Sequence, residues 1–160
     1  MSDPLKYAVV ERERRFLVHA IPDDVVSTRR IVDRYVQGTR LRLREVHDDD
    51  GAVTRKLTQK VRLGDGPAQV ACTNLYLDDA EWAALQRLSG HELRKTRHLV
   101  QRDGLVVAID ELPDDSLLAE IDDADQVPAD VPAWLDVVRE VSGDEAWTGA
   151  ALAQSFSTGA

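Results

Sequence analysis

The sequence has few of the features that stabilise a fold through disulfides or zinc, or that place it in a membrane. Cys72 is the only cysteine among 160 residues, so an internal disulfide is excluded, and no Cys-x-x-Cys pair or histidine cluster offers a zinc site. No apolar run approaches the roughly 18 residues of a membrane helix, and the first residues lack the pattern of a signal peptide. We therefore expect a protein of the cytoplasm without a membrane partner.

Basic residues are also in the minority. The chain has 20 lysines and arginines against 29 aspartates and glutamates, a formal charge of −9. This balance argues against a nucleic-acid partner, which needs a net basic face, although it leaves room for local clusters of cations. At 43% hydrophobic, 160 residues suit one domain, with a core over about 7–150 and a flexible tail at 155–160. The oligomeric state is left open, a homodimer included.

Most of the chain alternates between apolar and polar residues, which is typical of β-strands. The short turns between the alternating segments are rich in glycine and aspartate, and Asp103-Gly104 favours a type I′ hairpin. Because short hairpins join antiparallel neighbours, and closure removes exposed edges, we predict a closed eight-stranded antiparallel barrel with packing helices, an α+β fold. The predicted strands span about 7–18, 30–36, 39–47, 53–63, 68–77, 91–102, 105–112 and 116–122.

Three helices are predicted beside these strands. The first begins at Asp78, which forms a capping-box pattern with Glu81, and it ends before Gly90. A short helical turn is predicted after Pro22. The third helix is predicted over about 132–143, with proline in its first turn.

The charged residues alternate in an unusual way. Residues i and i+2 share one face of a strand, so Arg40, Arg42 and Arg44 point one way while the leucines between them point the other. On a single strand this would usually be a solvated face. Because five strands show it, and their rows separate by sign, we predict that the charged rows converge inside the barrel. The other four rows are Glu11, Glu13 and Arg15; Thr58 and Lys60; Lys95 and Arg97; and Glu120 and Asp122.

This arrangement of charges predicts a particular chemistry. Like-signed cations on one strand repel each other, so an arginine row requires an anionic partner, and arginine and lysine bind phosphate oxygens well. Carboxylates on separate strands can hold a hard divalent cation such as Mg²⁺ or Mn²⁺. The pattern therefore predicts phosphoryl transfer in a charged tunnel, with a water that attacks in line.

The charged strands resemble, in chain order, those of the CYTH or triphosphate tunnel metalloenzyme superfamily. The resemblance extends from residue 7 to about 150. It is carried by six segments, which are 10–18 (VERERRFLV), 40–44 (RLRLR), 57–60 (LTQK), 94–97 (RKTR), 107–110 (VAID) and 119–122 (AEID).

The resemblance implies an eight-stranded tunnel that binds a triphosphate-containing small molecule together with Mg²⁺ or Mn²⁺. Members of the superfamily hydrolyse inorganic, thiamine or nucleoside triphosphates, and some cyclise ATP. The residues that it implies for catalysis are Glu13, Lys95 and Asp110. It implies phosphate binding by Arg15, Arg42, Arg44, Lys60, Lys95 and Arg97, and metal binding by Glu11, Glu13, Glu120 and Asp122.

The chain departs from the superfamily pattern at three places. Arg15 replaces a lysine, and Cys72 and Asn74 stand where two inward glutamates are usual. The segment 147–149 (WTG) stands where a Tyr-x-Asn element is common. The leading hypothesis is a metal-dependent triphosphatase, and the alternatives are a non-catalytic module that binds polyphosphate or nucleotide, and ATP cyclisation to cyclic AMP.

Overall fold

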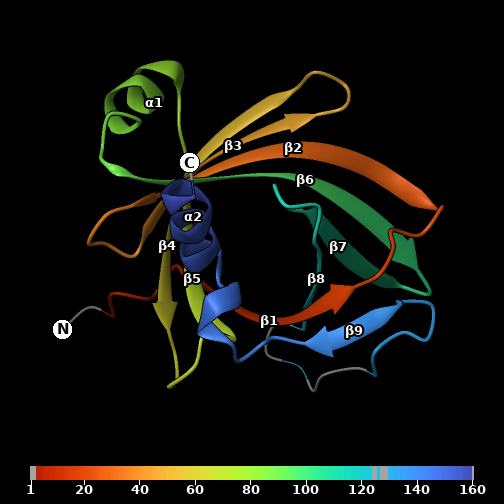
Figure 1. Ribbon diagram of the computed structural model, residues 1–160. Coiled ribbons are helices and arrows are strands. Elements are labelled where there is room, and N and C mark those ends of the chain that lie inside the picture. The colour runs from red at the N-terminus through yellow and green to blue at the C-terminus, as the bar shows by residue number, and fades with distance from the viewer. Residues whose placement is uncertain (1–2, 124–125, 127–129, 160) are drawn as a thin grey trace.

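The protein forms a β-barrel whose strands run antiparallel (Figure 1). The structure is a computed structural model that describes residues 3–123, 126 and 130–159. Eight strands follow the order β5-β4-β3-β2-β6-β7-β8-β1, and pairing of β1 with β5 closes the barrel. The prediction of a closed eight-stranded antiparallel barrel is confirmed. The strands are β1 (Val9–Val18), β2 (Val25–Val36), β3 (Leu41–Asp48), β4 (Val53–Arg62), β5 (Gln69–Tyr76), β6 (Gly90–Arg102), β7 (Leu105–Glu111) and β8 (Leu117–Asp122).

The seam of the barrel is shared by two strands. The first half of β1 pairs with β5, where Val9 lies opposite Cys72. Beyond this point a ninth strand, β9 (Val137–Glu140), continues along the same edge and pairs with the second half of β1. The predicted helix over 132–143 is therefore wrong. Its valines also fit a short edge strand, and the open edge of β1 supplies the backbone partners.

The turn chemistry agrees with the sequence. Asp103 and Gly104 both have positive φ angles, 53° and 77°, as a type I′ hairpin between β6 and β7 requires. The predicted helical turn after Pro22 is wrong, because β2 already begins at Val25, about five residues before its predicted start.

Within the described residues, two α-helices accompany the barrel. The predicted capping box of Asp78 and Glu81 is present and starts α1 (Asp79–Leu85). The second helix, α2 (Gly149–Thr158), was not predicted, and Thr148 caps its first turn. Residues 155–158, expected as a flexible tail, form the end of α2, while residue 160 lies outside the described ranges. A short 3₁₀ turn, η1 (Glu145–Trp147), precedes α2.

The apolar core lies on both faces of the sheet. Leu118 shares its face with Glu120, and Leu93 shares its face with Lys95, so these leucines point into the barrel. There they pack against Leu152 of α2. The helix α2 lies between strands β2 and β6 on one side and β1 on the other (Figure 1). The outer face carries the second cluster, which is formed by Phe16, Val18, Val100, Val107, Ile109, Ala119, Ile121 and Leu135. The interior is therefore apolar next to α2 and charged elsewhere.

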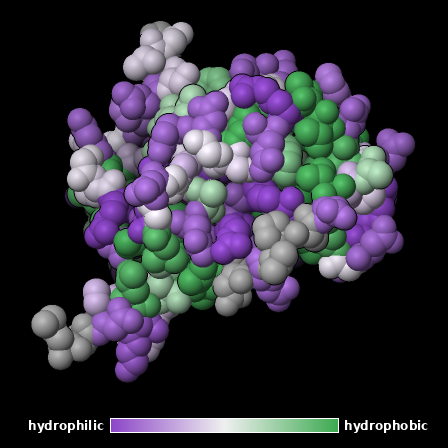
Figure 2. Space-filling view, turned by 90° about the horizontal axis from the view of Figure 1, so that it is seen from below, coloured by the Kyte–Doolittle hydropathy of each residue, from purple (hydrophilic) through white to green (hydrophobic). Residues whose placement is uncertain are grey.

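The surface seen from below mixes hydrophilic and hydrophobic residues, and its apolar groups are separated by polar ones (Figure 2). In the part of the chain that the structure describes, no helix combines the length and the apolar character needed to span a membrane.

Candidate active site

The barrel encloses a cavity of about 970 Å³. Nine basic and four acidic side chains line it, a formal charge of +5 inside a chain whose total is −9. Of the eleven site residues predicted from the sequence, ten line this cavity. They are Glu11, Glu13, Arg15, Arg42, Arg44, Lys60, Lys95, Arg97, Glu120 and Asp122.

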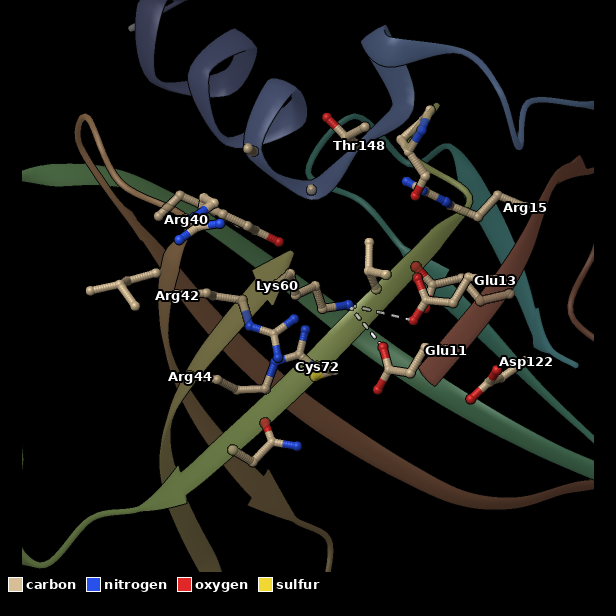
Figure 3. Close-up of a pocket in the computed structure, with 18 of the residues that line it drawn as sticks. Glu11, Glu13, Arg15, Arg40, Arg42, Arg44, Lys60, Cys72, Asp122 and Thr148 are labelled. Carbon is tan, nitrogen blue, oxygen red and sulfur yellow. Dashed lines mark hydrogen bonds and ion pairs between the residues drawn. The ribbon is translucent and has the colours of Figure 1, made fainter. Parts of the chain in front are cut away.

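The acidic residues come from two neighbouring strands. Glu13 of β1 lies opposite Asp122 of β8, and Arg15 lies opposite Glu120 in the same register. Figure 3 shows Glu11, Glu13 and Asp122 on one side of the cavity. We call Glu11, Glu13, Glu120 and Asp122 the carboxylate wall.

Lys60 reaches from β4 to the carboxylate wall (Figure 3). Its Nζ lies 3.2 Å from Glu11 Oε2 and 3.6 Å from Glu13 Oε1. Burial alone would raise the pKa of each glutamate, but the attraction of Lys60 outweighs it and holds both pKa values below their usual range. Both glutamates are therefore ionised at neutral pH.

The opposite side of the cavity carries cations from β3 and β4. Arg44 donates two hydrogen bonds to Asp33 of β2, with Nε to Oδ1 at 2.6 Å and a terminal nitrogen to Oδ2 at 2.7 Å. Arg42 Nε lies 3.8 Å from the same carboxylate. Burial would raise the pKa of Asp33, but Arg44 and Arg42 outweigh it and hold this pKa well below its usual range.

Asp33 was not singled out in the sequence, although it is fully buried behind the arginine row. The available signal was weak. Asp33 shares its strand face with Ile31 and Tyr35, so it was one carboxylate between two largely apolar side chains. Its role depends on the register of β2 and β3, which places it opposite Arg44.

Arg42 is held by a chain of hydrogen bonds. It donates to Thr58 Oγ1 at 3.2 Å, and Thr58 in turn donates to Asn74 Oδ1 at 2.6 Å. The Nε atom of Arg42 is buried and has no hydrogen-bond acceptor among the described residues. Lys56 also lines the cavity, and within residues 3–123, 126 and 130–159 it forms no ion pair. Lys56 is not among the site residues predicted from the sequence.

A third group of charges links β6, β7 and β8. Lys95 Nζ lies 2.6 Å from Asp110 Oδ2, while Arg97 donates to both oxygens of Asp110 and, at 2.7 Å, to Glu120. Asp110 has no exposed surface and does not line the cavity. It therefore lies behind the residues that line the cavity and holds Lys95 and Arg97 in position. This position differs from the direct catalytic role expected from the sequence.

Arg15 connects the cavity to the segment before α2. One terminal nitrogen donates to the carbonyl oxygen of Trp147 at 2.9 Å, and Nε has no acceptor in the part of the chain that the structure describes. Gly149 follows closely, and a Cβ at this position would lie 1.9 Å from the Tyr35 hydroxyl oxygen. A side chain at position 149 would therefore have to displace the Tyr35 ring from its place between α2 and β2.

Cys72 is a buried part of the cavity wall between β1 and β4. Burial and the nearby Glu11 raise the pKa of its thiol above the usual range. A thiol with a raised pKa carries little thiolate at neutral pH, so Cys72 does not have the low pKa of an activated nucleophile.

The carboxylate wall has the chemistry that Mg²⁺ or Mn²⁺ prefers. Across the described ranges, no three Asp, Glu, His or Cys side chains converge into a preformed metal cage. Mg²⁺ is usually held by one or two carboxylates, with water and substrate phosphates completing its coordination. The pairing of Glu13 with Asp122 on adjacent strands meets this smaller requirement.

Comparison with known proteins gives relatives by structure alone. No family model and no curated protein matches the sequence. One solved structure of NE1496, described as a hypothetical protein, superposes with a TM-score of 0.55 at 21% identity, over 89% of this chain and 97% of that one. The chain shares its fold.

Two further solved structures have this fold. The structure of the inorganic triphosphatase NE1496 gives a TM-score of 0.54 at 20% identity, over 89% of this chain and 93% of that one. A conserved hypothetical protein from Pyrococcus furiosus gives 0.55 at 17% identity, over 76% of this chain and 81% of that one.

Proposed function

We propose that this protein hydrolyses a small triphosphate-containing molecule bound inside the barrel, with Mg²⁺ or Mn²⁺ as cofactor. The observation that carries the proposal is that cations on β3, β4 and β6 face the carboxylate wall of β1 and β8 across one cavity. The shared fold with the inorganic triphosphatase NE1496 supports the same reaction class.

The cations would bind the phosphates. Arg42 and Arg15 both line the cavity, and neither guanidinium has a carboxylate within hydrogen-bonding distance among the residues described. Lys60 holds Glu11 and Glu13 at distances of 3.2 and 3.6 Å, which leaves its ammonium able to exchange these partners for phosphate oxygens. Charge-assisted hydrogen bonds of this kind are among the stronger polar contacts in proteins.

Glu13 and Asp122 are the residues that would hold the metal, with Glu11 and Glu120 beside them. When bound, the metal neutralises charge on the phosphate oxygens. Asp110 and Asp33 lie outside the cavity lining, and each fixes two of its cations. These cations then need no rearrangement during the reaction.

The carboxylate wall would also position the attacking water. Glu13 is ionised at neutral pH, so it can accept a hydrogen bond from water and then the proton that water loses. The oxygen of that water forms a bond to the terminal phosphorus while the bridging P–O bond breaks. The products are inorganic phosphate and a diphosphate, whose added charge is met by the arginines.

A substrate panel tests this proposal. Purified protein is incubated with tripolyphosphate, thiamine triphosphate or ATP and with Mg²⁺ or Mn²⁺, and both released phosphate and cyclic AMP are measured. We expect metal-dependent phosphate release with at least one compound. No release above background with any of them would refute hydrolysis, and cyclic AMP would identify ATP cyclisation instead.

Two substitutions test phosphate binding and metal-dependent turnover separately. Arg42→Ala should raise KM, because it removes a phosphate contact, whereas Glu120→Gln should lower metal-dependent turnover, because it removes one charge of the carboxylate wall and weakens the contact with Arg97. Activity that is unchanged in both variants would exclude this cavity as the active site.

A second candidate function is binding without turnover. Cys72 and Asn74 are neutral residues on the inward face of β5, so this wall supplies no carboxylate for metal. A binding module would be stabilised against heat by tripolyphosphate without releasing phosphate. An unchanged melting temperature on addition of tripolyphosphate would exclude this second function.

A further inference from the structure

Lys56 is a cation of the cavity that forms no ion pair with any residue the structure describes. It lies on β4 directly opposite Arg44, whose guanidinium donates two hydrogen bonds to Asp33. No carboxylate of the described residues pairs with the Lys56 ammonium, which has three donors to satisfy. Burial, Arg44 and Arg42 together hold the pKa of Lys56 below its usual range. An anion placed here would relieve this repulsion.

Further donors lie beside Lys56. Asn74 accepts the Thr58 hydroxyl through Oδ1, so its two amide N–H donors are left without an acceptor from any residue that the structure places. Arg42 lies opposite Thr58, midway along β4 between Lys56 and Lys60. β4 and β5 thus present donors without a carboxylate partner among the described residues at one part of the cavity, and Asn74 lies at its exposed margin.

These donors lie beyond the part of the cavity where the carboxylate wall faces Lys60. Lys56 and Lys60 are four positions apart on β4, on the order of 13 Å along an extended strand. An anion that contacts both the carboxylate wall and Lys56 must therefore extend along β4. The cavity, at about 970 Å³, is at the upper end of the roughly 300–1,000 Å³ range of ligand pockets, so it has room for such a molecule.

We propose that Lys56 and Asn74 form an additional anion subsite beside Arg42, and that the preferred substrate is a linear chain of at least four phosphates. The chain is either inorganic or esterified at one end, since both present the same terminal phosphates. This inference rests on the proposed function, because the remaining phosphates occupy the site between Lys60 and the carboxylate wall.

The test compares tripolyphosphate with inorganic tetrapolyphosphate. Binding is measured by calorimetry without metal, and kcat/KM is measured with Mg²⁺, for the wild type, Lys56→Gln and the surface control Lys6→Gln. The wild type should bind tetrapolyphosphate more tightly. Lys56→Gln should weaken its binding about tenfold, the size expected for one charge-assisted hydrogen bond, and should change tripolyphosphate binding less than about twofold. Lys6→Gln should change neither.

Asn74→Asp provides a second variant that keeps the acceptor for Thr58 and replaces the amide donors with a negative oxygen. It should weaken tetrapolyphosphate binding more than tripolyphosphate binding. Adenosine tetraphosphate distinguishes an esterified from an inorganic chain, because only an esterified preference makes it the better ligand.

The subsite and the proposed hydrolysis can fail separately. Equal wild-type affinity for the two polyphosphates, or equal losses in Lys56→Gln, would overturn the subsite even if tripolyphosphate is hydrolysed. Selective loss of tetrapolyphosphate binding without any turnover would support the subsite and count against hydrolysis.

Discussion

Replacing Asp33 with asparagine tests whether the cations of the cavity depend on a carboxylate behind the wall. Asp33 has no exposed surface and binds Arg44 through two hydrogen bonds of 2.6 and 2.7 Å, with Arg42 Nε at 3.8 Å. Asparagine preserves the volume but removes the negative charge, and its amide donors face guanidinium donors. Two buried cations are then left without their counter-charge.

The expected loss follows from this geometry. Removing one partner of a buried ion pair costs about 3–5 kcal/mol of unfolding free energy, because the remaining charge stays buried and uncompensated. For a domain of this size, each kcal/mol lowers the melting temperature by about 2–4 °C, so Asp33→Asn should lower it by about 6–20 °C. The matched control is Asp24→Asn, which removes an ion pair to Arg102 in which both side chains are more than one-third exposed. This control should change stability little.

Thermal and denaturant unfolding of both variants, followed by circular dichroism, measures the effect. Because the pKa of Asp33 is lower in the folded state, its stabilisation is complete above the usual carboxyl pKa and is lost as the pH falls below it. The gap between wild type and Asp33→Asn should therefore narrow from about pH 5 downward. A variant as stable as Asp24→Asn at pH 7, or a gap that widens in acid, would refute the assignment.

Two further predictions concern catalysis and packing. Glu13→Gln should lower kcat by about 100-fold or more, because it removes the proton acceptor, while tripolyphosphate still binds. The control is Glu111→Gln, which lies outside the cavity. Equal kcat values in the two variants would exclude a catalytic Glu13. Gly149→Ala should destabilise the fold by about 1–3 kcal/mol, since its Cβ would lie 1.9 Å from the Tyr35 hydroxyl oxygen. Gly143→Ala, where no described atom lies within 4 Å of the added Cβ, should be tolerated, and equal melting temperatures would contradict the packing argument.

The barrel and most of its charged lining were predictable because both follow from local alternation. A strand of period two sends Arg42 and Arg44 to one face regardless of distant contacts, and five such strands in one barrel direct their charges to one cavity. The partners of these charges were less predictable. Asp33 acts on Arg44 only through the register of two strands, and register depends on the whole sheet.

The errors near the C-terminus have a similar cause. The valines over 132–143 fit a helical period as well as a strand, and the choice between them depends on the free edge of β1, which is distant in sequence. The missed helix α2 has a weak apolar stripe because of its many small residues. Its usable signal was Thr148, an N-cap residue followed by a stretch rich in alanine.

The position of each carboxylate relative to the cavity wall explains how an acidic chain can build a cationic cavity. Asp33 and Asp110 offset the mutual repulsion of four cations. Because these two carboxylates lie outside the cavity lining, they do not face a bound anion. Glu11 and Glu13 also pair with a cation, Lys60, but they face the cavity, where phosphate and metal can replace this contact. The same type of ion pair therefore fixes the site in one place and remains exchangeable in the other. Lys56 has neither kind of partner among the described residues, which is why we expect its replacement to affect ligand binding first.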